Sequence, residues 1–312
     1  MNRISGALIL CLSIAAIGCG PGGDWGGWLK GRDSWLLISD GVVRERLPRL
    51  SKTGTKELQI ERATLRTEDM AEIGALQNLQ YLRLTRCNIN EDDFKYISRL
   101  QKLTRLDLAA ENTPDSAVVS VGELRGLKSL RLGGNGITDN GIAHLAKLEQ
   151  LEELTLMSNQ VTDAGIVHLS HLPRLKSLDV PPRVTGSAFD SFGKLDSVRY
   201  LDLSSSAFDD DGMKNLAKFE NLRTLNLWRT NVTDVGLMEV SGNYWLLNVF
   251  PSKHMTVVGM REFREKLLEG RRKAREMGLD VPPDDTLFIQ TDKDPEVRGA
   301  LPPRGYPKPQ DD

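Results

Sequence analysis

Arginine and aromatic side chains recur at matched positions in this chain, and these residue types commonly anchor non-covalent recognition. An early group holds Arg62, Tyr81, Arg83, Arg86 and Arg105, and a late group holds Tyr200, Trp228 and Arg229. Arg62 and Arg86 are 24 residues apart, as are Tyr81 and Arg105. We predict that Tyr81, Arg83, Arg86, Arg105, Tyr200, Trp228 and Arg229 bind a ligand. The alternative is a solvated surface whose charges only keep the protein soluble.

Residues that could support catalysis or bind a metal do not form a complete set. His144 and His168 are also 24 residues apart, but no cysteine or recurring carboxylate completes a metal site around them. The sequence contains no GxSxG, phosphate-loop or HExxH motif. We therefore predict no catalytic residue, no metal and no cofactor. The charge balance of 41 basic and 43 acidic residues also gives no reason to expect a nucleic-acid partner.

The common spacing comes from a 24-residue repeat that extends from about Thr55 to about Lys253. Successive units begin at Thr55, Leu79, Leu103, Leu127, Leu151, Leu175, Val198, Leu222 and, in decayed form, Leu246. In a repeat array each unit contacts its neighbours and cannot bury its apolar residues alone. The sequence thus predicts one continuous solenoid of about eight units plus the decayed one.

The unit LEELTLMSNQVTDAGIVHLSHLPR, residues 151–174, shows what each repeat requires. Leu154, Thr155 and Leu156 alternate apolar, polar and apolar, as in a short strand with one buried face. A polar residue, Asn159, follows in a buried turn, where its amide must be hydrogen-bonded. Thr162 or Asp163 can then cap a helix that buries one apolar stripe. Each unit is therefore expected to contain a strand, a turn, a helix and a return loop.

The pattern LxxLxLxxNxxTDxGIxxLxxL resembles the leucine-rich repeat, closest to its cysteine-containing and ribonuclease-inhibitor-like subtypes. This resemblance implies an α/β fold, a right-handed solenoid with parallel strands on its concave face and helices on its convex face. It also implies a binding role, with the exposed strand residues facing the ligand. Trp228 is the sharpest candidate on that face, because the aligned positions hold Ala109, Gly133, Met157 and Ser204.

The N-terminal residues 1–18 have the pattern of a signal peptide: Arg3 supplies positive charge and an apolar run follows. The sequence Ala16-Ile17-Gly18-Cys19 resembles the lipobox of bacterial lipoproteins, except that Ala16 stands where that family usually has leucine. The resemblance implies lipidation of Cys19 and a membrane anchor. An ordinary secretory signal, cleaved near the same place, is the alternative.

The remaining segments flank the repeats. We predict a flexible tether at residues 19–34, an N-terminal cap at 35–54, the leucine-rich repeat solenoid at 55–253, a C-terminal capping helix at 254–279 and a disordered proline-rich tail at 280–312. The basic run Arg271-Arg272-Lys273 is expected either at a solvated helix end or against anionic lipid. The sixth unit is one residue short and contains Pro181, so a change in curvature is expected there.

The sequence analysis thus predicts a non-catalytic scaffold that recognises a protein or peptide on its concave face. It also predicts lipid anchoring in a bacterial cell envelope, with a secreted or periplasmic protein as the alternative. Two other functions remain open: binding of carbohydrate or a surface polymer, supported only by Tyr200, Trp228 and Arg229, and an inhibitory or accessory role beside an envelope enzyme.

Overall fold

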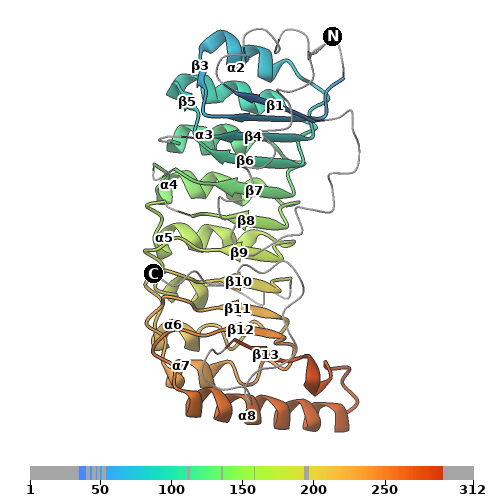
Figure 1. The fold of residues 1–312 in the computed structure, drawn as a ribbon, viewed down its shortest axis with the longest axis vertical. Coiled ribbons are helices and arrows are strands. Elements are labelled where there is room, and N and C mark those ends of the chain that lie inside the picture. The colour runs from blue at the N-terminus through green and yellow to red at the C-terminus, as the bar shows by residue number, and fades with distance from the viewer. Residues whose placement is uncertain are drawn as a thin grey trace, which may run out of the picture.

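A computed structural model of the protein describes residues 35–39, 43, 47, 50, 54–110, 113–134, 136–157, 159–192 and 197–290. Within them, one parallel sheet of 11 strands runs the length of the molecule, and each strand pairs with the next one in the sheet (Figure 1). These strands are β1 (Trp35–Ser39), β2 (Glu57–Glu61), β4 (Tyr81–Thr85), β6 (Arg105–Ala109), β7 (Ser129–Leu132), β8 (Glu153–Thr155), β9 (Ser177–Asp179), β10 (Tyr200–Asp202), β11 (Thr224–Asn226), β12 (Asn248–Phe250) and β13 (Phe288–Ile289). A short second sheet pairs β3 (Thr64–Leu65) with β5 (Asn88–Ile89).

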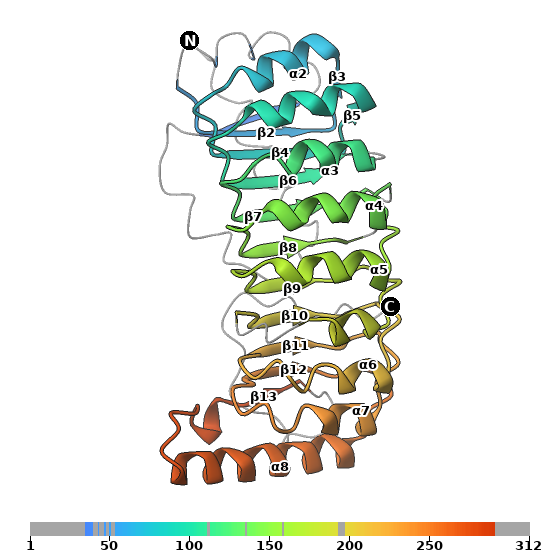
Figure 2. The same ribbon diagram turned by 180° about the vertical axis from the view of Figure 1, so that it is seen from behind.

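Helical segments cover one face of the large sheet, as the view from behind shows (Figure 2). The α-helices are α2 (Thr67–Gly74), α3 (Asp115–Val121), α4 (Asp139–Ile142), α5 (Asp163–Ile166), α6 (Asp210–Lys214), α7 (Asp234–Glu239) and α8 (Val257–Glu276). The 3-10 helices are η3 (Glu91–Arg99), η4 (Ala143–Lys147), η5 (Val167–His171), η6 (Ser187–Asp190) and η7 (Asp284–Thr286). The expected α/β solenoid is confirmed. We call the sheet face opposite the helices the concave face.

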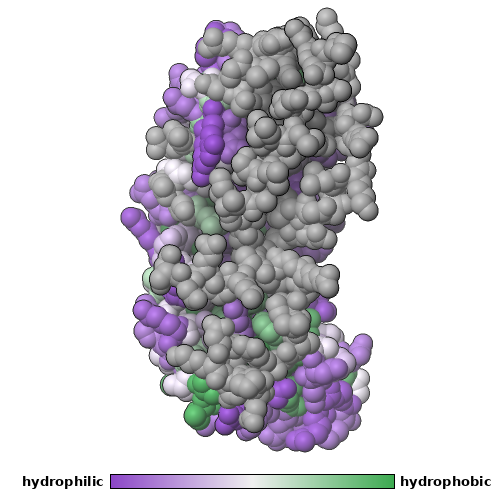
Figure 3. All heavy atoms as spheres, in the orientation of Figure 1, coloured by the Kyte–Doolittle hydropathy of each residue, from purple (hydrophilic) through white to green (hydrophobic). Residues whose placement is uncertain are grey.

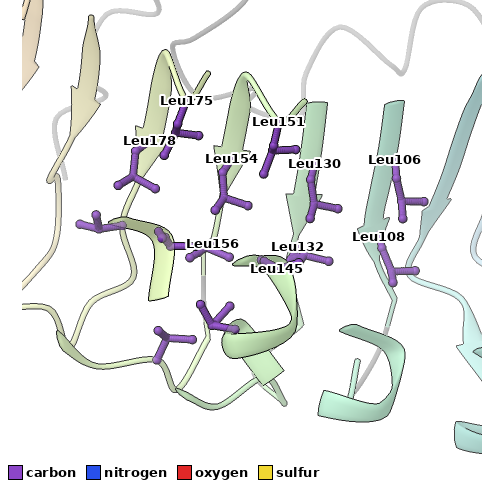
Figure 4. Close-up of a cluster of buried hydrophobic side chains, with 14 of the residues drawn as sticks. Leu106, Leu108, Leu130, Leu132, Leu145, Leu151, Leu154, Leu156, Leu175 and Leu178 are labelled. Carbon is purple, nitrogen blue, oxygen red and sulfur yellow. The ribbon is translucent and has the colours of Figure 1, made fainter. Parts of the chain in front are cut away.

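The recurring leucines form the core between the sheet and the helices. Leu130, Leu154 and Leu178 occupy matched positions on β7, β8 and β9, and all three are buried (Figure 4). Burying one such side chain contributes about 1.5–3 kcal/mol. Since every unit repeats this layer, the same leucines that stack the units also fix which strand residues face outward.

The threonine and aspartate of the repeat have separate tasks. Thr162 caps α5, because its hydroxyl accepts a hydrogen bond from the Ala164 backbone N–H. Asp139, from the preceding unit, accepts hydrogen bonds from the Thr162 backbone N–H at 2.7 Å and from its hydroxyl at 2.8 Å. The recurring glycine is explained by the same contact, since a Cβ on Gly165 would lie 2.5 Å from Asp139 Oδ1. The motif therefore links each unit to the next.

The buried polar position also bonds across units, as expected for an asparagine there. The Asn159 side-chain amide donates to the carbonyl oxygen of Leu132, in the preceding unit, at 2.9 Å. Cys87 holds the equivalent position, is buried and forms no disulfide within the described part of the chain. Its Sγ lies 3.5 Å from the carbonyl oxygen of Ile60, again in the preceding unit.

The short sixth unit leaves the sheet register intact. Tyr200 pairs with Ser177 and Asp202 with Asp179, so β9 and β10 remain aligned although their residues are 23 rather than 24 apart. The loop after Pro181 is one residue shorter than in the neighbouring units. In this loop Gly186 has a φ of 100°, and the 3-10 helix η6 follows it. Four buried phenylalanines fill the layer behind this unit, namely Phe189, Phe192, Phe208 and Phe219.

The C-terminal end contains more structure than the sequence analysis predicts. We expected residues 280–312 to be disordered, but η7 and β13 fold within this range, and Phe288 pairs with Asn248 of β12. Arg271 explains the difference: it is fully buried rather than solvated, and donates to backbone carbonyls of Tyr244, Leu246 and Pro283. Its guanidinium thereby ties α8 to the last repeat and to the segment leading into β13.

At the same end, hydrophilic side chains gather over α8 (Figure 3). In the described residues no helix is long and apolar enough to cross a membrane. Residues 1–34 and 291–312 lie outside the described part, and with them the expected signal peptide, Cys19, the tether and most of the tail.

Candidate binding surface on the concave face

Two groups of side chains lie on or beside the concave face, at opposite ends of the sheet. We call Arg62, Tyr81, Arg83, Arg86 and Arg105 the arginine patch; they lie on β4 and β6 or directly after β2 and β4. Strand pairing brings three of the predicted residues together, because Tyr81 is opposite Arg105 and Arg83, two positions along β4, is opposite Asp107. Parallel strands in a sheet are about 4.8 Å apart, so side chains at matched positions are direct neighbours.

Tyr81 and Arg105 form a stacked pair. The Arg105 guanidinium carbon lies 5.1 Å from the centroid of the Tyr81 ring, within range of a cation–π interaction. Burial, followed by the negative charge of Asp107, raises the pKa of the Tyr81 hydroxyl above its ordinary value. Tyr81 therefore stays neutral at physiological pH and presents a hydroxyl and a ring edge beside a cation.

Arg83 is held in place by two partners. Its Nε lies 3.3 Å from Asp107 Oδ2 and donates to the Thr85 hydroxyl at 3.0 Å. Asp107 is only 7% exposed, and its other oxygen, Oδ1, has no hydrogen-bond partner among the described residues. Burial accordingly raises the pKa of Asp107, and the neighbouring arginines oppose the shift. The Arg83 side chain itself remains 40% exposed and can contact a ligand.

The second group is built around a chain of hydrogen bonds on β10 and β11. Asp202 Oδ2 accepts from the Tyr200 hydroxyl and from the Asn226 side-chain amide, each at 3.0 Å. Asp202 Oδ1 accepts from the Ser204 backbone N–H, and Asn226 Oδ1 accepts from that of Trp228 at 3.1 Å. The structure therefore connects Tyr200 to Trp228 through Asp202 and Asn226.

Trp228 differs from the sequence expectation of a large exposed aromatic. It is half-buried, and the Arg229 guanidinium carbon lies 4.1 Å from its ring centroid. The pairing explains why a tryptophan is tolerated where other units have small residues, since one ring face is covered by the neighbouring arginine. The pair still presents an aromatic edge and a cation at the surface.

Two phenylalanines on the same face escaped the sequence analysis. Phe250 is the strand neighbour of Asn226, and its ring centroid lies 6.2 Å from that of Phe288 on β13. Phe250 was not predicted because the last unit departs from the repeat pattern, and Phe288 lies in the range expected to be disordered. The short apolar run Leu287-Phe288-Ile289 is the signal that the sequence offers for Phe288. We call Tyr200, Trp228, Arg229, Phe250 and Phe288 the aromatic patch.

An acidic pair separates the two patches. Asp179 and Asp202 are direct neighbours on β9 and β10. Burial, followed by repulsion from Asp202, raises the pKa of Asp179 well above its ordinary value. In the described residues no group of three or more histidine, cysteine or carboxylate side chains is placed to hold a metal. The arrangement offers cations, hydroxyls and aromatic edges, which suit recognition of another molecule.

Comparison with known proteins agrees with this architecture. A family model for a leucine-rich repeat region matches residues 46–235. No curated protein matches the chain. Among solved structures, an internalin (InlF) from Listeria monocytogenes str. 4b F2365 is similar, with 15% identity over 77% of this chain and 85% of that chain, and a TM-score of 0.37. A likeness at that level gives no information about the ligand.

Proposed function

Because the chain belongs to the leucine-rich repeat family, we propose that it is a non-catalytic scaffold that binds a protein or peptide on its concave face. The observation that supports this function most is the pairing of two chemically different patches on one continuous sheet. Tyrosine, tryptophan and arginine are enriched at the centres of protein interfaces; the arginine patch contains tyrosine and arginine, and the aromatic patch contains all three. A folded protein or extended peptide is long enough to contact both patches, whereas a small molecule is not.

Truncation of one anchor in each patch tests this function. The proposal expects Arg83→Ala and Trp228→Ala each to reduce partner capture in pull-downs from native cells by at least tenfold, or about 1.4 kcal/mol, as for interface anchors. Lys147→Ala is the matched control, since this exposed residue lies on η4, on the helical side. Capture that is unchanged by both substitutions would contradict concave-face binding.

Carbohydrate or surface-polymer binding is the alternative, and the aromatic patch is its only support. A sugar ring stacks on an open aromatic face, but Arg229 lies over one face of Trp228. The sugar would have to displace that guanidinium or use the other, partly buried face. Glycan-array binding that is abolished by Trp228→Ala would favour this alternative over a protein partner.

Lipid anchoring at Cys19, in a bacterial cell envelope, is the proposed location. It rests on the signal-like residues 1–18 and the lipobox-like sequence that ends at Cys19. A single attached acyl chain gives only marginal membrane binding, so more than one chain would be required for stable attachment. Metabolic labelling with a palmitate analogue is expected to mark the wild type and not Cys19→Ser. Unlabelled wild-type protein would instead favour the secreted or periplasmic alternative.

A further inference from the structure

One backbone position recurs in an unusual conformation just after the strands. Arg62, Arg86, Ser205 and Arg229 have φ values of 54°, 53°, 59° and 58°, in the left-handed region that favours glycine. They hold the same position of the repeat, which Gly134 also occupies with a φ of 125°. In this conformation the backbone N–H extends the hydrogen-bond ladder of the parallel sheet to the next unit. Arg62 N–H donates to the Thr85 carbonyl at 3.0 Å, and Arg86 N–H donates to the Ala109 carbonyl at 2.9 Å.

A turn with this backbone conformation does not require arginine. Ser205 donates the equivalent backbone hydrogen bond, to the carbonyl of Trp228 at 2.8 Å, with a small side chain. A non-glycine residue in the left-handed region is strained, and asparagine and aspartate adopt it several times more readily than most residues. Arginine nevertheless occupies three of the four non-glycine positions found in the described residues. Retention of a long cation at a strained position points to a use for its side chain.

Arg62 and Arg86 lie at neighbouring backbone positions, at the ends of two paired strands. They follow paired strands directly, and parallel strands are about 4.8 Å apart. Both side chains are exposed. Arg62 has one weak ion pair, with Glu61 at 3.7 Å, whereas within the described part of the chain no hydrogen bond or ion pair engages the Arg86 guanidinium. Two adjacent cations repel each other, so the pair favours binding of an anion.

Further arginines on the neighbouring strands extend the preference for an anion along the sheet. Arg83 and Arg105 lie on the neighbouring concave positions, and the buried carboxylate of Asp107 is already engaged by Arg83. A carboxylate accepts two parallel N–H donors from one guanidinium, so paired arginines suit glutamate and aspartate side chains well. Tyr81, stacked with Arg105, offers a surface for the stem of such a side chain.

We propose that Arg62 and Arg86 form a two-arginine clamp for an acidic peptide segment of the protein partner. The clamp deepens the function proposed above and depends on it. A glutamate or aspartate side chain of the partner binds between the two guanidiniums, and adjacent acidic residues contact Arg83 and Arg105. The positively charged end of the concave face thus determines where the acidic part of the partner lies.

The test uses the full chain and a fluorescent 12-residue peptide of alternating glutamate and serine, compared with the same peptide carrying glutamine for glutamate. The double variant Arg62→Asn/Arg86→Asn removes both cations and keeps a residue type that tolerates the backbone. Fluorescence anisotropy is expected to show at least tenfold weaker binding of the acidic peptide to this variant. The wild type should lose affinity when salt is raised, and the variant should respond much less.

Lys147→Ala is the matched control, because it removes an exposed cation on the helical side, outside both patches. It is expected to bind the acidic peptide as the wild type does. The urea midpoint of the double variant should equal or exceed that of the wild type, which separates lost binding from lost folding. Equal binding by the double variant, equal binding of the glutamine peptide, or no binding of the acidic peptide would each overturn the clamp. Partner capture that persists in the double variant but is lost in Trp228→Ala would overturn the clamp and leave concave-face binding intact.

Discussion

The arginine patch and the aromatic patch occupy equivalent parts of the same repeat, yet they are held in place differently. Arg83 has an ion pair with an aspartate whose second oxygen is unpaired. Asp202, which lies beside the aromatic patch, accepts three hydrogen bonds from its surroundings. The repeat therefore fixes the positions of the side chains, and the local partners decide whether a patch stays available for an outside ligand or serves stability.

The largest expected difference is between two aspartates at equivalent strand positions. Asp202→Ala leaves the Tyr200 hydroxyl, the Asn226 amide and a backbone N–H without their acceptor, and is expected to lower the free energy of unfolding by about 2–4 kcal/mol. Asp107→Ala removes one ion pair to a partly exposed arginine and should cost less than about 1 kcal/mol. Urea denaturation of both variants measures the difference. Equal losses would show that the two patches are not held differently.

A smaller, pH-dependent effect is expected from Asp179, between the patches. Its folded pKa is raised above the ordinary value of 3.8, so the folded state binds more protons than the unfolded state between the two pKa values. Stability should therefore fall as the pH rises through this window. Asp179→Asn removes this pH dependence and is expected to be more stable than the wild type at neutral pH. The difference in stability between the two proteins should vanish at pH values below the ordinary carboxylate pKa. Thermal melts across pH that show the same gap at every pH would contradict this explanation.

The smallest effect distinguishes two arginines with the same strained backbone. Arg86→Asn relieves strain and loses no recorded contact, so it is expected to raise the free energy of unfolding by roughly 0.5–1 kcal/mol. Arg229→Asn gains the same relief but loses the stacking on Trp228, which is worth a similar amount, about 0.5–1 kcal/mol. Its stability should remain near that of the wild type. If urea titrations showed the same increase in the free energy of unfolding for both variants, the stacking on Trp228 would contribute nothing to stability.

The sequence predicts those features that the repeat itself requires. The leucine layer, the cross-unit bond of Asn159 and the alternation of strand and helix all follow from burial and hydrogen-bonding needs that recur every 24 residues. The Thr–Asp motif was assigned to helix capping, and the structure adds that the aspartate serves the next unit. A sequence pattern shows which residue types recur, but it does not show with which unit each side chain forms its hydrogen bonds.

Features that depend on contacts between distant or non-repeating segments could not be predicted. Phe288 reaches the concave face through the pairing of β13 with β12, and the buried Arg271 holds the segment before β13 against the last repeat. The burial of Trp228 depends on a neighbouring side chain, and the strain at Arg62 and Arg86 depends on backbone geometry. None of these leaves a periodic signal, and each lies in one of the two patches or at the end of the solenoid.

Photo-crosslinking in native cells tests the central claim most directly. A photo-reactive amino acid in place of Thr155, at the middle of the concave face on β8, should trap a protein partner. The same amino acid in place of the exposed Ala164, on α5 on the helical side, should trap none. The account predicts an adduct from the Thr155 position that disappears when Trp228→Ala is added. An adduct from the Ala164 position alone would contradict it.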